Sequence, residues 1–515
     1  MRRLPLAAAL ALLLLAPTGA LAAIAPSPTT ATGVVAVAVA SSSVKDVATY
    51  PDGSQLIGGD YDGVVKFGGT VLPNAGLSNI FVAKVNPDGS YAWAVGASAS
   101  SNDLTLDAVA VLPDGSAVAV GRVRGTATFG GTTLSSSVND VFIAYISASG
   151  AFTGAIQGTV MGGAEASDVA ALADGSILVT GDFTRDLHFA SDPAISVTSS
   201  LWGTSDAFVL KLSPTRRVNW LVRAGGKDSS DVPNAIAALP DGSSIIAGQY
   251  NQATVIGATS FPWLGMIDAF AAKLSPSGAI QWAVNGGGNW LDMFTGVIVQ
   301  PDGSAIVTGY MSTTATYGPL SATSAGEADG MVAEISADGT YRWVRTIGST
   351  GGDTAFDAAV LGDGTIAVAG DVSTATQFAG APLGVAGTDS GYLVRLTGNG
   401  APLTGTTFGE RGVAIALRSP TSVAVGGSFI GSVTFGGVTL TAATPAARAG
   451  FVASFDAPVV TAEAAAQAES ADAATASAPT TFTMSARYVA GRRRGRVIAH
   501  VRAPAAGTIR LSVKG

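Results

Sequence analysis

Cysteine is absent from this chain of 515 residues. Its absence excludes disulfide bonds, thiolate metal sites, a cysteine nucleophile and a lipid-anchored N-terminal cysteine. Histidine is almost as rare: the only two are His188 and His500, so no histidine pair or triad can form within the body of the chain. The sequence therefore holds few of the side chains on which catalytic and metal sites usually depend.

Long apolar runs are also lacking, except at the N-terminus. There, two arginines precede an apolar run from Leu4 to Ala16, and an A-x-A arrangement ends at Ala22, a pattern typical of a Sec-type signal peptide. The run is shorter than the roughly 18 residues that a membrane anchor needs. We therefore predict a signal peptide over residues 1–22 and a secreted, cell-surface or periplasmic protein that is not an integral membrane protein.

Positive charge is scarce in most of the chain. Residues 23–456 hold 33 acidic and 18 basic residues, a net charge of −15, whereas the remaining residues to 515 hold 3 acidic and 8 basic ones. Because nucleic acids are polyanions, this acidic body predicts no nucleic-acid binding.

A repeated Asp-Gly turn organises the chain. The fragment PDGS, or a close variant, recurs at intervals of 60 to 67 residues, and a glycine follows each Asp after seven residues. A seventh copy keeps the spacing, with Ser419 and Pro420 in place of Asp and Gly. A fixed period near 60 residues indicates a repeat architecture. The turn aspartates are Asp52, Asp114, Asp174, Asp241, Asp302 and Asp363.

Each repeat predicts four β-strands. In the first copy, VATY and SQLIG flank one Asp-Gly turn, and FVAKV and YAWAV flank another. Short apolar runs on both sides of such a turn are typical of a β-hairpin, so two hairpins give four strands. The fourth strand carries a tryptophan at an equivalent place, which predicts packing between neighbouring repeats, at Trp93, Trp220, Trp282 and Trp343.

The chain ends favour a closed ring over a solenoid, the competing architecture. The seventh repeat stops after Phe451–Phe455 without a fourth strand, while residues 33–40 look like an orphan fourth strand ahead of the first repeat. We predict an all-β, seven-bladed β-propeller of four-stranded blades over residues 33–456. Its N-terminal strand closes the last blade and leaves no exposed edge.

Several recurring motifs belong to one pattern: DVxxxPDGS, the glycine seven residues after the Asp, an FGG stretch, DxFVAKL and G-x-x-x-W. The FGG stretch occurs at Phe67–Gly69, Phe129–Gly131 and Phe435–Gly437. In this combination the chain resembles the SBBP (seven-bladed β-propeller) repeat family of secreted bacterial proteins. The resemblance implies an exported propeller, and it implies no catalytic residue that could be carried over.

Two further segments follow the predicted propeller. Residues 457–480 are rich in Ala and Ser and predict a linker, since nothing periodic in them indicates a packed helix. Residues 481–515 contain three short β-rich runs and resemble the start of an immunoglobulin-like module, too short for a complete sandwich. We predict a partial β-sandwich there.

Four aspartates near the start of the first strand of their repeats predict a possible metal site. Converging carboxylates at the mouth of a propeller channel could hold Ca²⁺, the one cofactor that the sequence suggests. The alternative is that each carboxylate accepts backbone N–H bonds and fixes the loop of its own blade, which their recurrence favours. The four are Asp46, Asp107, Asp168 and Asp357.

The segments between the second and third strands differ in every repeat and should lie opposite the PDG turns. The third and fourth of them contain His188, Trp202 and Trp263. Exposed aromatic side chains can stack on sugar rings or anchor a protein partner, so these residues are the candidate ligand site. The alternative is that they cover the edges of their own blades.

The sequence thus predicts an exported, non-catalytic binding protein for a glycan, a cell-wall polymer or a protein. One alternative is a propeller enzyme, such as a lyase, a hydrolase or a quinone-dependent dehydrogenase. It would need a cluster of His, Arg, Glu or Tyr that departs from the repeat. The other alternative is a purely structural spacer.

Overall fold

The computed structural model describes residues 31–37, 41–100, 104–199, 203–385, 389–408, 412–435, 438–457, 459–477, 483–489 and 496–502. Antiparallel strands dominate these residues, and their only α-helix is α1 (Ala462–Ser477). In the described residues no helix has the length and apolarity that crossing a membrane requires. The predicted signal peptide, residues 1–22, lies outside the described residues.

The chain is built from four-stranded antiparallel units, each except the last made of two hairpins, as the sequence predicts. The short Asp-Gly turns close the hairpins, and the turn glycines adopt positive φ, as at Gly53 (79°). The first three units are β2 (Ser41–Thr49), β3 (Gln55–Asp62), β6 (Ser78–Val85) and β7 (Tyr91–Ala99); β8 (Leu104–Val111), β9 (Ala117–Phe129), β10 (Thr132–Ile146) and β11 (Phe152–Val160); and β12 (Gly163–Ala171), β13 (Ile177–Thr184), β16 (Asp206–Leu212) and β17 (Val218–Ala224).

Four more units follow, numbered 4 to 7 in chain order. The last of them takes its fourth strand, β1, from the N-terminus. The four units are β18 (Asp231–Ala238), β19 (Ser244–Tyr250), β22 (Asp268–Leu274) and β23 (Ile280–Gly288); β24 (Met293–Val299), β25 (Ala305–Tyr317), β26 (Leu320–Ile335) and β27 (Tyr341–Ile347); β28 (Thr354–Val360), β29 (Ile366–Val372), β32 (Ser390–Leu396) and β33 (Pro402–Phe408); and β34 (Gly412–Ser419), β35 (Ser422–Ile430), β38 (Arg448–Asp456) and β1 (Ala31–Val37).

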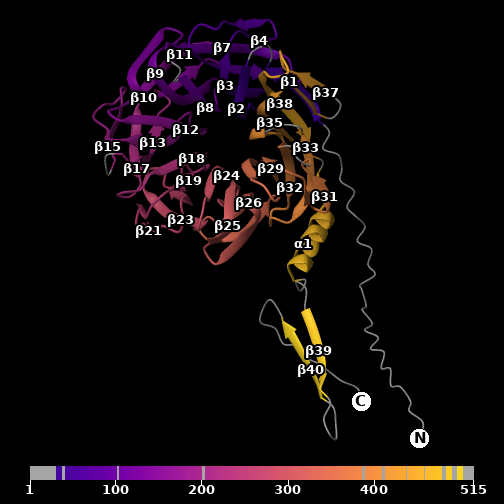
Figure 1. Ribbon diagram of the computed structural model, residues 1–515. Coiled ribbons are helices and arrows are strands. Elements are labelled where there is room, and N and C mark those ends of the chain that lie inside the picture. The colour runs from indigo at the N-terminus through magenta and orange to yellow at the C-terminus, as the bar shows by residue number, and fades with distance from the viewer. Residues whose placement is uncertain are drawn as a thin grey trace, which may run out of the picture.

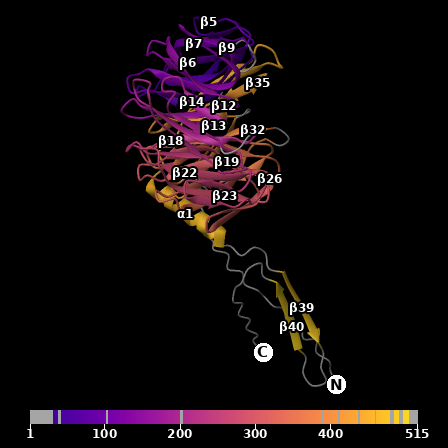
Figure 2. The ribbon, with the colours of Figure 1, turned by 90° about the vertical axis from the view of Figure 1, so that its left-hand side faces the viewer.

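The first strands of the units surround a common axis. They contact one another in the cyclic order β2, β8, β12, β18, β24, β28, β34 and back to β2. Figure 1 shows the resulting ring, and Figure 2 shows it edge-on. The arrangement is propeller-like, with hydrophobic cores between successive units, as where Phe142 of unit 2 and Leu56 of unit 1 belong to one buried core.

The N-terminal strand completes unit 7, as predicted. β1 runs antiparallel to β38, with Val35 opposite Val452. The described strand is Ala31–Val37, slightly displaced from the predicted 33–40, because residues 38–40 fall outside the described residues.

The segments between second and third strands contain strands of their own. Each has a small outer hairpin, which in three repeats carries the FGG pattern: in the first, Phe67 is buried and Gly68 turns the chain with a φ of 58°. Several of these hairpins touch the last strand of the preceding unit, as where β14 pairs with β11. Five are separate strand pairs, and two are the outer ends of β9 with β10 and of β25 with β26. The pairs are β4 (Val65–Phe67) with β5 (Thr70–Leu72), β14 (Asp186–Phe189) with β15 (Ser196–Thr198), β20 (Thr254–Ile256) with β21 (Thr259–Phe261), β30 (Thr376–Phe378) with β31 (Ala381–Leu383), and β36 (Ser432–Phe435) with β37 (Val438–Thr441).

The repeated tryptophans pack between units, which confirms their predicted role. The Nε1 of Trp282 in unit 4 donates to the carbonyl oxygen of Ala337 in unit 5 at 3.0 Å. A Cβ on the nearby turn residue Gly339 would lie 3.0 Å from the same indole, so this turn requires glycine. Trp93, Trp220 and Trp343 make the same bond to Ala148, Pro276 and Gly398.

The junction of units 2 and 3 lacks the tryptophan and is filled by a side chain from the opposite unit. Gly154 stands at the tryptophan position of unit 2, and Arg216, with a φ of 64°, stands at the turn-glycine position of unit 3. The Arg216 guanidinium lies 4.1 Å from the Tyr145 ring centroid and donates to the Thr153 hydroxyl at 2.8 Å. A large side chain still fills the junction, but it comes from the turn rather than from the strand.

The predicted linker, residues 457–480, contains a docked helix, so the expectation of an unpacked linker is wrong for this part. Helix α1 lies against the last strand of unit 6, where Ala468 is buried beside Leu403. An ion pair joins Arg345 of unit 5 to Asp472. Alanine supplies helix propensity, and a single small side chain with a few charges is enough to dock the helix.

The C-terminal segment forms a two-stranded sheet of β39 (Thr483–Val489) and β40 (Arg496–Arg502). The third predicted strand, at residues 507–515, lies outside the described residues. The predicted partial sandwich is therefore described only as one hairpin.

Candidate functional site

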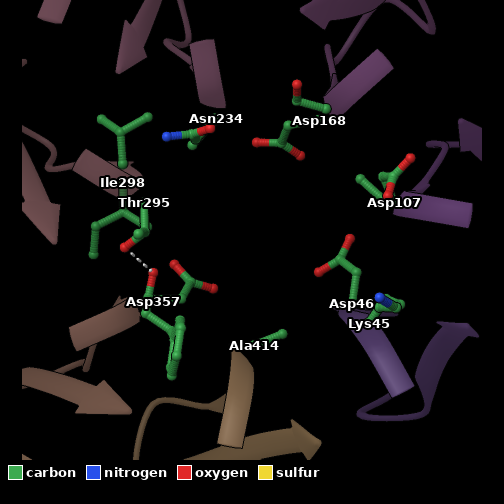
Figure 3. A pocket seen from close by; sticks show the side chains of 15 residues that line it. Lys45, Asp46, Asp107, Asp168, Asn234, Thr295, Ile298, Asp357 and Ala414 are labelled. Carbon is green, nitrogen blue, oxygen red and sulfur yellow. Dashed lines mark hydrogen bonds between the residues drawn. The ribbon is translucent and has the colours of Figure 1, made fainter. Parts of the chain in front are cut away.

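An axial pocket of about 240 Å³ opens where the first strands of the units converge (Figure 3). Each of these seven strands has a β-bulge at the same place, as between Val44 and Asp46 in β2. A bulge bends the strand and re-aims the side chains around it. The side chains at the bulge and directly after it therefore line the pocket.

The four aspartates of the predicted metal site do not occupy one equivalent position. Asp46, Asp168 and Asp357 directly follow the bulge of their strands, whereas Asp107 is itself the bulge residue, one place earlier. All four line the pocket, as Figure 3 shows, but Asp107 stands in the place that Lys45 has in unit 1.

The three equivalent carboxylates join neighbouring units through backbone amides. Asp46 accepts from its own neighbour Val47 at 2.7 Å and from Val109 of unit 2 at 2.8 Å. Asp168 and Asp357 repeat this pattern, accepting from Ile236 of unit 4 at 2.7 Å and from Ile415 of unit 7 at 3.2 Å. The alternative to a metal site is that each carboxylate accepts backbone N–H bonds within its own blade. These bonds are present, and each carboxylate also accepts a bond from the next unit.

Two other polar side chains also form hydrogen bonds to the backbone of the next unit, at two further junctions. The Asn234 side-chain amide donates to the Phe294 carbonyl oxygen at 2.7 Å, joining units 4 and 5. The Thr295 hydroxyl donates to the Phe356 carbonyl oxygen at 2.8 Å, joining units 5 and 6. The polar lining of the axial pocket is therefore largely engaged in holding the ring together.

Burial raises the pKa of these carboxyl groups despite their hydrogen bonds. Loss of hydration at the converging strands raises the pKa of Asp46 to about 6 and that of Asp357 to about 7, and it raises the pKa of Asp168 well above its ordinary value. Neighbouring carboxylates add to the shift, because Asp46 repels both Asp168 and Asp357. The ionised form of these three carboxyl groups is therefore disfavoured by lost hydration and by mutual repulsion.

Asp107 differs from the other three. Burial, followed by repulsion from Glu165 and Asp60, raises its pKa to about 8. Its Oδ2 atom is buried without a hydrogen-bond partner, while the nearby Arg122 pairs with Glu165 of unit 3. Among the described residues no group of three or more His, Cys, Asp or Glu side chains is arranged to hold a metal ion. The Ca²⁺ site at these aspartates stays a prediction.

A second surface, on the rim of the ring, gathers large apolar side chains in solvent. Trp263 is 58 % exposed and Trp290 is 53 % exposed, and Leu264 and Met266 accompany them at 36 % and 51 %. These four residues form what we call the rim patch. It comprises the loop between β21 and β22 of unit 4 and the loop between β23 and β24, where unit 4 gives way to unit 5.

Backbone hydrogen bonds join the two loops of the rim patch. The amides of Met266 and Ile267 both donate to the Trp290 carbonyl oxygen, at 2.9 and 3.1 Å. Beneath them, the fully buried carboxylate of Asp268 accepts from the Leu264 amide at 2.9 Å. A Cβ on Gly265 would lie 2.2 Å from the Gly288 carbonyl oxygen, so only glycine permits this close approach.

The same pair of loops recurs between units 5 and 6 with different side chains. There, the Asp329 carboxylate accepts from the Ala325 amide at 3.0 Å, and the Asp353 amide donates to the Ala328 carbonyl oxygen at 2.8 Å, matching Asp292 and Ile267 in unit 4. In this twin, small or polar residues replace the apolar four: Ser324, Ala325, Glu327 and Gly351 stand for Trp263, Leu264, Met266 and Trp290. The loop frame therefore does not require the apolar side chains.

The predicted ligand residues are only partly brought together. Trp263 is exposed on the rim, and its role in ligand binding stays a prediction. His188 is half-buried in β14 of unit 3, where its backbone pairs with Thr159 of unit 2. Trp202 lies outside the described residues.

Sequence reasoning missed Trp290 and Met266. Trp290 could have been found by aligning the loops of successive repeats, because Gly351 and Ser229 stand at its position in other units. The signal is a bulky apolar residue at a loop position where other repeats have small or polar ones. It does not hold for Met266, because Leu77 stands at the same position in unit 1.

No protein-family model matches the chain, and no curated protein matches it. The chain is similar to a solved structure of unknown function from Dyadobacter fermentans (11 % identity, TM-score 0.34, covering 83 % of this chain and 98 % of that one). It is also similar to one of unknown function from Bacteroides caccae (14 %, 0.31, covering 60 % and 84 %) and to a gluconolactonase from Xanthomonas campestris (14 %, 0.31, covering 65 % and 85 %). Similarity at this level carries no argument about the function of this chain, and the resemblance to SBBP repeats gains no support from a family match.

Proposed function

We propose that this protein is an exported, seven-bladed β-propeller of the SBBP kind, with units 1 to 7 as its blades, that binds a ligand without catalysis through the rim patch. The seven-bladed arrangement is supported by the cyclic contacts of the first strands and by the pairing of β1 with β38. Export is supported by the signal-peptide pattern of residues 1–22.

One observation carries the binding function. The loops between units 4 and 5 share two hydrogen bonds with the loops between units 5 and 6, one to the carboxylate of Asp268 or Asp329 and one to the carbonyl oxygen of Ile267 or Ala328, yet of these two loop pairs only the first presents tryptophans to solvent. Since the frame stands without them, folding does not account for these side chains. Exposed apolar side chains gathered at one place are typical of an interaction site.

The axial pocket supports this assignment by contrast. Its aspartates, Asn234 and Thr295 hold neighbouring units through backbone groups. Residues so engaged are poorly placed to change partners during a reaction.

An enzyme is the second candidate, and Asp107 is the observation that favours it. Its raised pKa and its unpartnered Oδ2, close to Glu165 and Arg122, are features that catalytic carboxyl groups share. Such an enzyme would be a hydrolase or a lyase that uses a carboxylic acid at neutral pH. The replacement Asp107→Asn would then abolish turnover of the substrate while leaving binding at the rim patch intact.

The binding function can be tested with the mature protein and a variant that carries the residues of the twin loops, Trp263→Ser with Trp290→Gly. Both proteins are passed over immobilised glycans, cell-wall polymers and exported proteins of the source cell. We expect retention of the parent protein on at least one of these supports, and loss of that retention in the variant at an unchanged melting temperature. Retention that is equal for both proteins would exclude the rim patch as the binding surface.

A further inference from the structure

We propose that the ligand of the rim patch is an uncharged glycan chain, whose sugar rings stack on the indoles of Trp263 and Trp290. The inference rests on the proposed function, because it takes the rim patch to be the binding surface. It names the class of ligand that the size, the rigidity and the charge of this surface fit.

The size of the rim patch fits a few sugar rings. A tryptophan side chain presents at most about 250 Å², and these two are 58 % and 53 % exposed. Together the indoles therefore offer roughly 300 Å², and Leu264 and Met266 enlarge the patch only in part. A stable protein interface buries about 800 Å² on each partner. The patch by itself is smaller than the area that a stable protein interface buries, and it is comparable with a short stretch of a sugar polymer.

The rigidity of the patch favours stacking. The two loops that hold the indoles are joined by the bonds from Met266 and Ile267 to the Trp290 carbonyl oxygen, and Gly265 packs directly on the second loop. Asp292 fixes that second loop by accepting from the Gly288 amide at 2.8 Å and from the Ser312 amide at 3.1 Å. A surface that is ordered before binding loses little conformational entropy, which suits a ligand that offers only weak contacts per ring.

The charge around the patch favours an uncharged polymer. None of its four side chains carries a charge, and the carboxylates below it, Asp268 and Asp292, are fully buried and face the loop amides. The body of the chain has a net charge of −15 over residues 23–456, so a polyanionic glycan would be repelled. Asn289, which is exposed next to Trp290, can donate to and accept from sugar hydroxyl groups.

The test uses the mature full-length protein and isothermal titration with defined uncharged oligosaccharides: linear β-1,4-, β-1,3- and α-1,4-glucans, a mannan and a xylan, each of six or seven rings. Alginate and hyaluronan fragments serve as anionic probes. Two single variants carry residues that other units have at the same loop positions: Trp263→Asn, as at Asn74 of unit 1, and Trp290→Ser, as at Ser229 of unit 3.

We expect at least one uncharged oligosaccharide to bind, with affinity that rises with chain length up to a few rings. Each single variant should weaken it at least tenfold, while the melting temperature stays within about 1 °C of the parent value because exposed side chains contribute little to stability. The variant Met266→Glu, which carries the residue of the twin loop, should weaken the uncharged ligand far less than either tryptophan variant.

Three outcomes would overturn the inference. They are preference for the anionic probes, lack of binding to every uncharged oligosaccharide of the panel, and binding that neither tryptophan variant changes. If the parent protein is instead retained by an exported protein through Trp263 and Trp290, the glycan inference fails and the proposed binding function stands. If a ligand is retained equally by parent and variants, both fail.

Discussion

The axial pocket and the rim patch are opposite uses of one repeated scaffold. In the axial pocket, polar side chains that recur among the repeats have partners across the unit junctions, as Asp168 has in the Ile236 amide. In the rim patch, apolar side chains appear in one copy of a loop pair and face solvent, while the same loop frame stands elsewhere without them. Recurrence marks the residues that the fold needs, and an exposed exception marks a candidate for binding.

A departure from the repeat does not by itself indicate a binding site. Arg216 and Gly154 also break the pattern, at the junction of units 2 and 3, but they compensate each other, because Arg216 fills the space that a tryptophan fills elsewhere. The rim patch has no such compensation within the described residues. This contrast separates exceptions that serve packing from exceptions that serve binding.

The largest effect should follow from deleting residues 33–40, which removes most of β1. Unit 7 would lose its fourth strand, and β38 would expose an edge that can pair with other chains. We expect aggregation or a melting temperature lowered by more than 10 °C, measured by size-exclusion chromatography and calorimetry. A truncated protein that stays monomeric and melts like the parent would contradict closure by β1.

The next effect compares two tryptophans of unit 4. The replacement Trp282→Ala removes an indole between units together with its bond to Ala337, and it should cost about 3 kcal/mol. Trp263→Ala removes an exposed indole and should change the free energy of unfolding by less than about 0.5 kcal/mol. Urea unfolding of both variants measures the difference, and equal losses would mean that the rim patch also supports the fold.

A smaller effect compares two aspartates of the axial pocket. Asp168→Ala leaves the amides of Val169 and Ile236 without an acceptor and should cost about 1–3 kcal/mol. Asp107→Ala removes a carboxyl group with an unpartnered oxygen and should leave stability unchanged or raise it. Should Asp107→Ala prove the more damaging of the two, the assignment of these residues would be reversed.

The last comparison concerns the dependence of stability on pH. Burial raises the pKa of Asp46 from 3.8 to about 6 and that of Asp357 from 3.8 to about 7. The folded state therefore binds more protons than the unfolded state between about pH 4 and pH 7, and these groups make stability fall as pH rises through that window. The melting temperature should be higher near pH 5 than near pH 8, and the double variant Asp46→Asn with Asp357→Asn should flatten the profile.

The sequence predicted what the repeat encodes. The strands, the packing of Trp282 and the partner of β1 all follow from residues that recur at fixed offsets, and these predictions are confirmed. The register of Asp107 could have been read from spacing and was missed: Asp107 precedes its turn aspartate, Asp114, by seven residues, whereas the other three aspartates precede theirs by six. The docking of α1 was missed because one alanine, Ala468, supplies most of its buried contact.

The candidate binding site was only half predictable. Trp263 stood out in the sequence, but its partner Trp290 comes from a different connection in the chain. Only the backbone bonds from Met266 and Ile267 reveal that the two loops form one surface. The prediction for Trp202 stays open, since it lies outside the described residues.

The pairing of β1 with β38 also sets an order of events in the life of the chain. Val35 is synthesised among the first residues, and its partner Val452 leaves the ribosome only after all the other strands of the ring. β1 must therefore stay without its partner until β38 has been made, and unit 7 cannot be completed before that point. Until then, the protein depends on whatever shields the unpaired β1 from other chains.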